Sequence, residues 1–183
     1  MKAVFLDRDG VICHNRDDHV KSWDEFQFID GAKEAIARLT KVGLPVVVVT
    51  NQAAINRGLT SASLVDNIHR RMIAEVASCG GRIVRVYYCP HRPDEHCGCR
   101  KPQPGMLLQA ADELGIDLQE SYLIGDTISD VQAAQSVGVK AYMVLTGRGK
   151  DQYVASLCQG RSGFRLSPDL RTAVHDILRV ESL

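Results

Sequence analysis

The sequence has no excess of either charge, since Lys+Arg and Asp+Glu both number 22 and the formal net charge is zero. That balance argues against a general nucleic-acid binder, which normally carries a basic excess. No apolar run approaches the ~18 residues of a membrane span. Residues 1–4 lead directly into a predicted strand and leave no room for a signal peptide. We therefore expect a cytosolic monomer with neither a membrane nor a nucleic acid as partner.

Disulfides are not expected either, because the six cysteines belong to a protein predicted to be cytosolic. Cys13, Cys79 and Cys158 are scattered, and we interpret them as ordinary thiols. The other three crowd into the eleven residues 89–99. At 183 residues the chain suits one domain, 1–183, and is long enough to bury a substantial core.

A short apolar run near the start of the chain ends in two carboxylates. Asp7 and Asp9 follow the apolar residues 4–6, and Gly10 permits a turn directly after them. Two carboxylates at the end of a buried strand are costly unless a positive charge lies beside them. Mg²⁺ prefers such oxygen ligands, so the pair predicts a magnesium site. Taken alone, the segment fits a strand with an acidic turn equally well.

Strand-like apolar runs alternate with helical patterns along the rest of the chain. This alternation predicts an α/β fold, a Rossmann-like three-layer open parallel sheet with helices on both faces. We expect strands near 44–49, 83–88, 122–124 and 140–145, and helices near 32–42, 61–79, 105–114, 128–137 and 169–180. Ligands bind such sheets outside the carboxyl ends of the strands. Asp7, Thr50, Cys89 and Asp126 fall at those ends, and loop 13–24 should line the same mouth.

Four polar segments at these strand ends supply what phosphoryl transfer needs. That reaction uses a nucleophile, a proton donor, cations and hydrogen-bond donors placed in advance. The segments are Asp7-x-Asp9-Gly10, Thr50-Asn51, Arg100-Lys101-Pro102 and Gly125-Asp126-x3-Asp130.

These segments resemble the four motifs of the haloacid dehalogenase superfamily of phosphatases. The resemblance implies that Asp7 attacks phosphorus and becomes an aspartyl phosphate. Asp9 would protonate the leaving alkoxide and then activate the hydrolytic water. Thr50 and Lys101 would hold the phosphoryl oxygens.

The same resemblance implies how Mg²⁺ is held. Its ligands would be the side chains of Asp7 and Asp126 and the backbone carbonyl of Asp9. Asp130 would orient these ligands without binding the ion itself. Capping of the helix that follows is an equally good interpretation of Asp130.

Three cysteines and a histidine lie close together in the loop after the third predicted strand. Cys89, His91, Cys97 and Cys99 form a Cys3His set, a common structural zinc site. His96 is the poorer choice of ligand because it adjoins Cys97. The alternative is a loop with surface cysteines and an unrelated histidine. We expect Zn²⁺ to hold the loop, about 89–104, that carries the basic pair of the third segment.

This zinc loop followed by Arg-Lys-Pro resembles the bacterial D-glycero-D-manno-heptose 1,7-bisphosphate 7-phosphatases over about 4–149. Histidinol-phosphate phosphatases share the aspartates and the zinc loop, and they or another small phosphomonoester phosphatase are the alternatives. The stretch Asn56-Arg57-Gly58 favours the heptose group. Both groups lack a large cap domain, and the gaps after Asp9 and Thr50 are too short for one. The resemblance implies hydrolysis of a phosphorylated sugar with Mg²⁺ and Zn²⁺ as cofactors.

Two positions depart from the heptose group. Thr127 stands where those enzymes usually have lysine, and Asp18-His19 where they tend to have Gly-Tyr. Both positions face substrate in that group, so the sugar and its anomer are left open. We assign substrate contacts to four residues: Asn51, Arg100, His19 and Arg57. A solvated surface position is an even alternative for Arg57.

The remaining candidates have simpler interpretations. Arg148 and Lys150 fit a solvated basic turn better than a contact to a remote phosphate. His69 and His175 lie in predicted helices and are expected at the surface or in packing contacts. A zinc-stabilised module that only binds a phosphate ligand would need one of the four motifs to be broken, and none is. A polynucleotide phosphatase would need a basic groove, against which the zero net charge argues.

Overall fold

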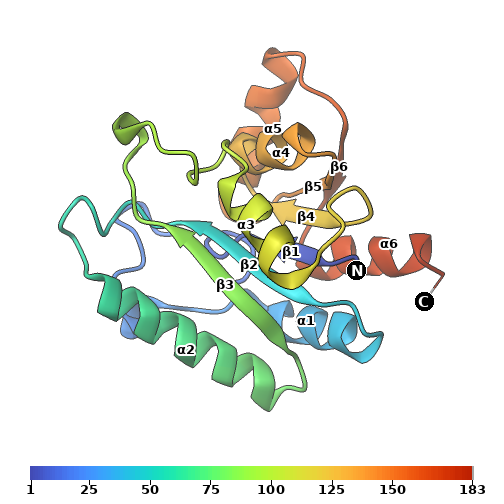
Figure 1. Ribbon diagram of the computed structural model, residues 1–183, viewed down its shortest axis with the longest axis horizontal. Helices are drawn as coiled ribbons and strands as arrows, with labels where there is room; N and C mark the ends of the chain where they lie inside the picture. The colour runs from blue at the N-terminus through green and yellow to red at the C-terminus, as the bar shows by residue number, and fades with distance from the viewer. Residues whose placement is uncertain (183) are drawn as a thin grey trace.

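Six parallel strands form the centre of the fold in this computed structural model, which describes residues 1–182 (Figure 1). They are β1 (Val4–Leu6), β2 (Val46–Asn51), β3 (Ile83–Cys89), β4 (Tyr122–Gly125), β5 (Lys140–Val144) and β6 (Phe164–Ser167). The sheet order is β3-β2-β1-β4-β5-β6. Phe5 of β1 aligns with Val47 of β2 on one side and with Leu123 of β4 on the other. The strand order therefore reverses between β1 and β4, where open α/β sheets form ligand sites.

Helices cover both faces of the sheet, as the alternating pattern predicts. One face carries α1 (Ala32–Lys41), α2 (Ala62–Ser78) and α6 (Leu170–Val180) (Figure 1). The other carries α3 (Gly105–Leu114), α4 (Ile128–Ser136) and α5 (Gly149–Cys158). Two 3-10 turns, η1 (Trp23–Glu25) and η2 (Pro93–Glu95), lie in loops. The predicted three-layer α/β fold is confirmed.

Alternate residues of the central strand face two apolar layers. Leu6 belongs to the same buried cluster as Ile36 of α1 and Ile68 of α2, whereas Phe5 clusters with Leu107 of α3. All five side chains are buried, and each such burial stabilises the fold by about 1.5–3 kcal/mol. β1 is thus held from both faces, which fixes the point where the carboxylates of the first motif begin.

Besides the two 3-10 turns, the structure contains one strand and one α-helix that the sequence did not predict. β6 lies at the edge of the sheet and has two exposed residues among its four, so it lacks a continuous apolar run. α5 begins at Gly149, inside the segment predicted to be only a basic turn. It buries only Gly149 and Ser156, so no apolar stripe marks it in the sequence.

The loops at the carboxyl edge of the sheet are too short to contain a cap domain. Residues 7–31 form a loop with the turn η1, and residues 52–61 join β2 to α2. The rings of Trp23 and Phe26 stack at 5.0 Å, and Phe28 packs edge-on against Phe26, which anchors the first loop. Within residues 1–182, no helix combines the length and the apolar character needed to cross a membrane.

Candidate active site

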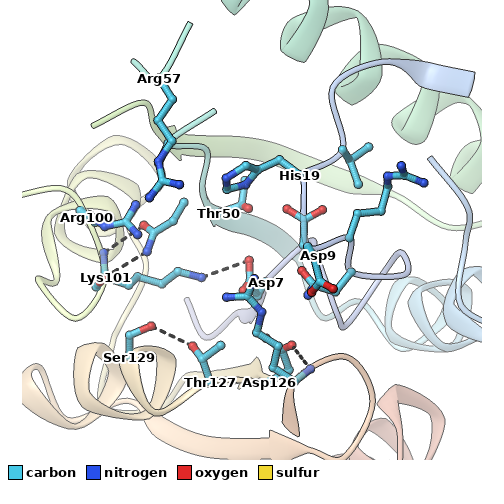
Figure 2. A pocket seen from close by; sticks show the side chains of 17 residues that line it. Asp7, Asp9, His19, Thr50, Arg57, Arg100, Lys101, Asp126, Thr127 and Ser129 are labelled. Carbon is cyan, nitrogen blue, oxygen red and sulfur yellow. Dashed lines mark hydrogen bonds and ion pairs between the residues drawn. The ribbon is translucent and has the colours of Figure 1, made fainter. Parts of the chain in front are cut away.

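A polar cavity of about 250 Å³ opens at the carboxyl ends of β1, β2 and β4 (Figure 2). Most residues that the sequence assigns to phosphoryl transfer line it: Asp7, Asp9, His19, Thr50, Asn51, Arg57, Arg100, Lys101 and Asp126. Asp130 is fully buried behind this lining. Segments far apart in the sequence therefore meet here because the sheet order places their strands side by side.

Asp7 and Lys101 form a buried ion pair (Figure 2). Lys101 Nζ lies 3.1 Å from Asp7 Oδ1 and 2.5 Å from Asp130 Oδ1, and it donates to the Val49 carbonyl at 2.8 Å. Burial raises the pKa of Asp7 to about 7, although Lys101 opposes this shift. Burial disfavours the Lys101 cation, but Asp130 and Asp7 outweigh it and raise the pKa of Lys101. Lys101 is therefore a fixed positive charge beside Asp7.

Three neighbours hold the Asp9 carboxylate. Arg8 donates to Asp9 Oδ1 from Nε at 3.3 Å and from Nη2 at 3.0 Å, and to Oδ2 from Nη2 at 3.0 Å. Gln52 Nε2 donates to Oδ2 at 2.8 Å, and the Cys13 thiol donates to Oδ1 at 3.4 Å. Burial acts to raise the pKa of Asp9, but Arg8 and Gln52 keep it below its ordinary value. Asp9 is thus an ionised carboxylate fixed in the cavity wall.

Asp7, Asp126 and Asp130 form a cluster of buried carboxylates whose oxygens lie within 4.8 Å of one another. Burial, together with the charges of Asp7 and Asp130, raises the pKa of Asp126 to about 8. When all three carboxylates are ionised, they and the single ammonium of Lys101 leave two negative charges, which a divalent cation would neutralise. Clustered carboxylate oxygens are ligands that Mg²⁺ prefers. The residues present therefore fit the predicted magnesium site.

Two glycines make room for the Asp126 carboxylate. A Cβ on Gly10 would lie 2.0 Å from Asp126 Oδ2, and a Cβ on Gly147 would lie 2.3 Å from the same atom. Thr146 Oγ1 donates to the Gly10 carbonyl at 2.6 Å, and the Arg148 amide donates to Asp126 Oδ2 at 2.8 Å. The turn after β5 therefore packs directly against the first motif and holds the Asp126 carboxylate in place.

Asp130 caps the helix that follows, which is one of the two interpretations that the sequence left open. Its Oδ2 accepts from the amide and the hydroxyl of Thr127 at 3.1 and 2.6 Å, which caps α4. Its Oδ1 pairs with Lys101. The Thr127 hydroxyl also lies 2.8 Å from the Ser129 hydroxyl, and both line the cavity. One side chain thus ties the start of α4 to the lysine beside Asp7.

Thr50 and Asn51 lie together at the end of β2 but make different contacts. Thr50 Oγ1 accepts from Gln52 Nε2 at 2.9 Å and borders the cavity. Asn51 Nδ2 donates to the Lys101 carbonyl and its Oδ1 accepts from the Lys101 amide, both at 3.1 Å. The Asn51 amide, assigned to substrate from the sequence, is therefore engaged in positioning the loop that carries Lys101.

Guanidinium groups from separate loops line the cavity at its mouth: those of Arg57, Arg100 and Arg148, and that of Arg16, which is paired with Asp18. Arg57 and Arg148 are both exposed. Arg100 Nη1 donates to the His91 carbonyl at 3.1 Å. His19 has a left-handed backbone with φ of 66°, and burial followed by Arg57 and Arg148 lowers its pKa. A neutral imidazole therefore faces a positively charged mouth.

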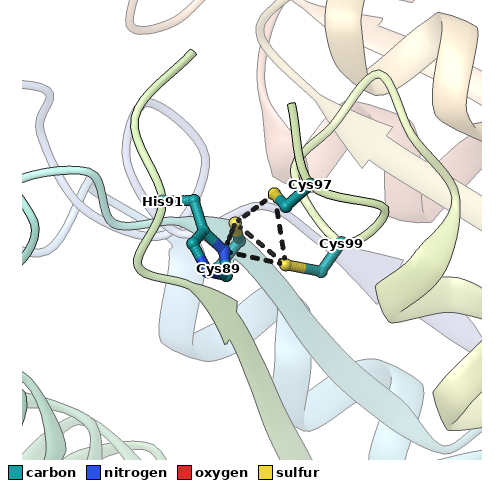
Figure 3. Close-up of side chains that lie close together, drawn as sticks. All are labelled: Cys89, His91, Cys97 and Cys99. Carbon is teal, nitrogen blue, oxygen red and sulfur yellow. Dashed lines mark hydrogen bonds between the residues drawn. The ribbon is translucent and has the colours of Figure 1, made fainter. Parts of the chain in front are cut away.

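The predicted zinc ligands meet at one point of the loop after β3 (Figure 3). Cys99 Sγ lies 3.1 Å from Cys89 Sγ and 3.5 Å from Cys97 Sγ, and His91 Nδ1 lies 3.4 Å from Cys89 Sγ and 3.3 Å from Cys99 Sγ. Ligands at about 2.3 Å around a tetrahedral zinc would be ~3.8 Å apart, close to this spacing. His96 is not in the group.

Sequence reasoning gave no role to three residues of this site: Arg8 and Gln52, which hold Asp9, and Ser129, which adds to the lining. Asn15, Arg16 and Asp17 line the cavity from the loop that was expected to border it. The one available signal for Arg8 was a cation between two carboxylates at the end of a buried strand. His69, expected at the surface or in packing, is buried and lies 3.1 Å from Arg8 Nη1.

Comparison with known proteins finds relatives that are similar to this chain over most of its length. A family model described as HAD-hyrolase-like matches residues 98–173. The D-glycero-beta-D-manno-heptose-1,7-bisphosphate 7-phosphatase of Pseudomonas putida is 43% identical over 150 residues, 82% of this chain and 86% of that protein. The enzyme of the same name from Bordetella bronchiseptica is 39% identical over 181 residues, 98% of this chain and 99% of that protein.

A solved structure extends this likeness to the fold. The crystal structure of D,D-heptose 1,7-bisphosphate phosphatase from B. bronchiseptica, complexed with magnesium and phosphate, matches with a TM-score of 0.92 and 38% sequence identity. The match covers 98% of this chain and 99% of that one, so it includes all four motif segments.

Proposed function

Because this chain belongs to the D-glycero-beta-D-manno-heptose-1,7-bisphosphate 7-phosphatase family, we propose that it removes the 7-phosphate of such a heptose bisphosphate. The chain is a phosphoric monoester hydrolase with a haloacid dehalogenase-like fold. The observation that carries the residue assignment is the buried pair of Asp7 and Lys101, which shares one cavity with Asp9 and Asp126.

Asp7 is the nucleophile in this proposal. Lys101 holds its carboxylate at the end of β1 and, with the Thr50 hydroxyl, offers hydrogen-bond donors to the phosphoryl oxygens. Attack of an Asp7 oxygen on phosphorus breaks the bond to the sugar oxygen and gives an aspartyl phosphate. Asp9, which is ionised in the free protein, first takes up a proton, which the monoanionic phosphate ester can supply. It donates this proton to the departing oxygen and then accepts one from the water that hydrolyses the aspartyl phosphate.

The Asp7 and Asp126 side chains and the Asp9 backbone carbonyl would hold Mg²⁺. The bound ion supplies positive charge that stabilises the oxygens of the transferred phosphoryl group. The two uncompensated negative charges of the carboxylate cluster support this assignment, because they would otherwise repel an anionic substrate. Asp130 contributes by holding Lys101 and the start of α4.

Zn²⁺ is assigned to the four clustered ligands Cys89, His91, Cys97 and Cys99. A set of four protein ligands fills a tetrahedral site and leaves no position for a reacting water, which makes the metal structural. The hydrogen bond from Arg100 to the His91 carbonyl ties this loop to the cavity. Zinc would therefore order the loop that carries Arg100 and Lys101.

The positively charged mouth favours a substrate with a second phosphate. Four arginines, Arg16, Arg57, Arg100 and Arg148, line the cavity in a chain whose total charge is zero, and of these Arg16 is paired with Asp18. A bisphosphate matches this concentration of charge better than histidinol phosphate, whose distal end carries an amine and an imidazole. Thr127 and His19 face the same cavity, so they contribute to the choice of sugar and anomer.

A phosphate-release screen tests the proposed substrate. It compares kcat/KM for both anomers of the heptose 1,7-bisphosphate with that for histidinol phosphate and simple sugar monophosphates, and phosphorus NMR identifies the remaining ester. We expect the bisphosphate to be preferred roughly ten- to a hundredfold, since a hydrogen bond to a charged group contributes about 1.5–3 kcal/mol. Higher activity on histidinol phosphate would show that the heptose bisphosphate is not the preferred substrate. Release of the 1-phosphate in place of the 7-phosphate would overturn the proposed site of hydrolysis.

Three sequence-based expectations stay predictions: a single domain over 1–183, a monomeric state and a cytosolic location. Size-exclusion chromatography with light scattering would test the monomer. Limited proteolysis would test the single domain, and cell fractionation would test the location.

A further inference from the structure

Arg8 is the largest side chain that is fully buried among the described residues, although it carries a charge. A buried charge is costly unless it is paired and hydrogen-bonded. Arg8 meets this condition with three partners, because Asp9, Gln52 and His69 all lie within hydrogen-bond distance of its guanidinium. The guanidinium contacts both oxygens of Asp9, so it fixes the plane of that carboxylate as well as its charge.

Gln52 closes a ring with Arg8 and Asp9. Its Oε1 accepts from Arg8 Nη2 at 3.0 Å, and its Nε2 donates to Asp9 Oδ2 at 2.8 Å. The same nitrogen donates to Thr50 Oγ1 at 2.9 Å. The amide orientation is thereby determined at both ends, and the side chain at the end of β2 cannot turn without breaking contacts on both sides.

His69 holds the far side of the guanidinium. It lies on α2, 61 positions from Arg8, and its Nε2 is 3.1 Å from Arg8 Nη1. An arginine has only donors, so His69 Nε2 must accept and its proton must sit on Nδ1. The residue is 5% exposed, and its ring packs against that of Tyr88 with centroids 5.5 Å apart. His69 does not line the cavity, so any effect it has on the reaction must pass through Arg8.

We propose that Arg8 is the positioning residue for Asp9, and that His69 and Gln52 hold Arg8 in place, so that α2 supports proton transfer without touching substrate. The physical reason is directional, because a proton donor must point at the departing oxygen and a misplacement of about 1 Å can cost roughly a hundredfold in rate. This inference rests on the proposed role of Asp9 as the proton donor.

The test compares two substrates whose leaving groups differ in their need for a proton, because a positioning role and a merely structural role predict different losses of activity on them. A sugar phosphate releases a poor alkoxide that needs the proton, whereas p-nitrophenyl phosphate releases a stable phenolate that does not. We compare kcat/KM on the two esters, because this ratio reports the steps up to departure of the alcohol. Loss of orientation at Asp9 must weaken the first reaction much more than the second.

The variants are His69→Leu, which removes the acceptor, and His69→Gln, whose carbonyl can still accept from Arg8. The matched control is His175→Leu, because exposed His175 on α6 also lies near an arginine, Arg38, at 3.5 Å. We expect His69→Leu to lose roughly tenfold on the sugar phosphate, a part of the 10²–10⁴ that a general acid contributes, and about twofold or less on the aryl ester. His69→Gln should regain most of the loss.

Equal losses on both esters, no loss at all, or no rescue by His69→Gln would each overturn the inference. If His69→Leu does not fold, Arg8→Lys replaces it, since lysine keeps the charge but cannot bridge both Asp9 oxygens and His69. Asp9→Asn is measured in the same assay. If Asp9→Asn shows no dependence on the leaving group, the proposed role of Asp9 fails. If it shows that dependence and the Arg8 and His69 variants do not, only the inference fails.

Discussion

Removal of one carboxylate from the cluster of Asp7, Asp126 and Asp130 should stabilise the metal-free protein while abolishing its activity. Burial and the two neighbouring carboxylates raise the pKa of Asp126 from its ordinary value of 3.8 to about 8. Because the pKa in the folded state is the higher one, the native protein binds the proton more tightly than the unfolded chain across this range. Stability therefore falls as pH rises from about 4 to 8, and Asp126→Asn removes this loss.

The size of the effect follows from the same shift. At pH 7 ionisation of Asp126 costs at most roughly 4 kcal/mol, since each pKa unit corresponds to about 1.4 kcal/mol. The repulsion between Asp126 and Asp7 raises the pKa of both groups, so its energy must not be assigned in full to Asp126 alone. We therefore expect Asp126→Asn to raise the free energy of unfolding by about 2 kcal/mol. The asparagine carbonyl can still accept the hydrogen bond that the Arg148 amide donates to Asp126.

The assay is urea unfolding at pH 7, first in EDTA and then in excess Mg²⁺. In EDTA, Asp126→Asn should be more stable than the wild type. Mg²⁺ should stabilise the wild type strongly and the variant little, because a ligand that binds the native state adds free energy of unfolding. The matched control is Asp112→Asn, an exposed carboxylate on α3 whose change should stay within about 0.5 kcal/mol.

Two results would refute this reasoning. If Asp126→Asn is less stable than the wild type in EDTA, the carboxylate is not under electrostatic strain in the folded protein. If Mg²⁺ stabilises the variant as much as the wild type, Asp126 is not a ligand, and the magnesium site must be sought elsewhere.

Three further predictions address the nucleophile, the zinc loop and the buried histidine. Asp7→Asn should fold normally by circular dichroism yet lose more than about a hundredfold in kcat, roughly 3 kcal/mol of barrier, and a smaller loss would exclude Asp7 as nucleophile. Elemental analysis should find about one zinc per chain, and Cys97→Ser should lower zinc content, thermal stability and activity together; purified wild type without zinc would remove the site. Burial, then Arg8, lowers the pKa of His69 to about 3, so below pH ~6.5 the unfolded chain takes up a proton that the native protein does not. His69→Gln should therefore lose about 2 kcal/mol less stability than the wild type between pH 7 and pH 5 in urea melts, and equal losses would show that His69 does not set the acid sensitivity.

The short-range patterns of the sequence determined the fold class and most of the residues at the site. The alternation of apolar strands and amphipathic helices depends on local periodicity, and the three-layer sheet it predicts is confirmed. Asp7 and Asp9 are recognisable because they directly follow a buried strand, and the proposed zinc ligands because four donors lie within eleven residues. The resemblance carried by the four motifs is confirmed by family membership.

The elements that the sequence missed lack such a local pattern. β6 has a half-exposed, unpatterned sequence, and α5 buries almost nothing. Their positions are set by what they pack against, the edge of β5 and the neighbouring helix α4. No periodicity along the chain could reveal them, because the contacts that stabilise them are made with segments distant in sequence.

The partners of the proposed catalytic groups were decided only by the tertiary structure. Sequence gives Lys101 a positive charge, but the fold sets it between Asp7 and Asp130, and Asn51 at the end of β2 holds its backbone. The sequence likewise gives no partner for Arg8. Packing of α2 brings His69, 61 positions away in the sequence, to the Arg8 guanidinium. Residue type fixes what a side chain can donate or accept. The distant group with which a side chain forms its hydrogen bond or ion pair depends on how helices and strands pack, and that information is not contained in any local stretch of the chain.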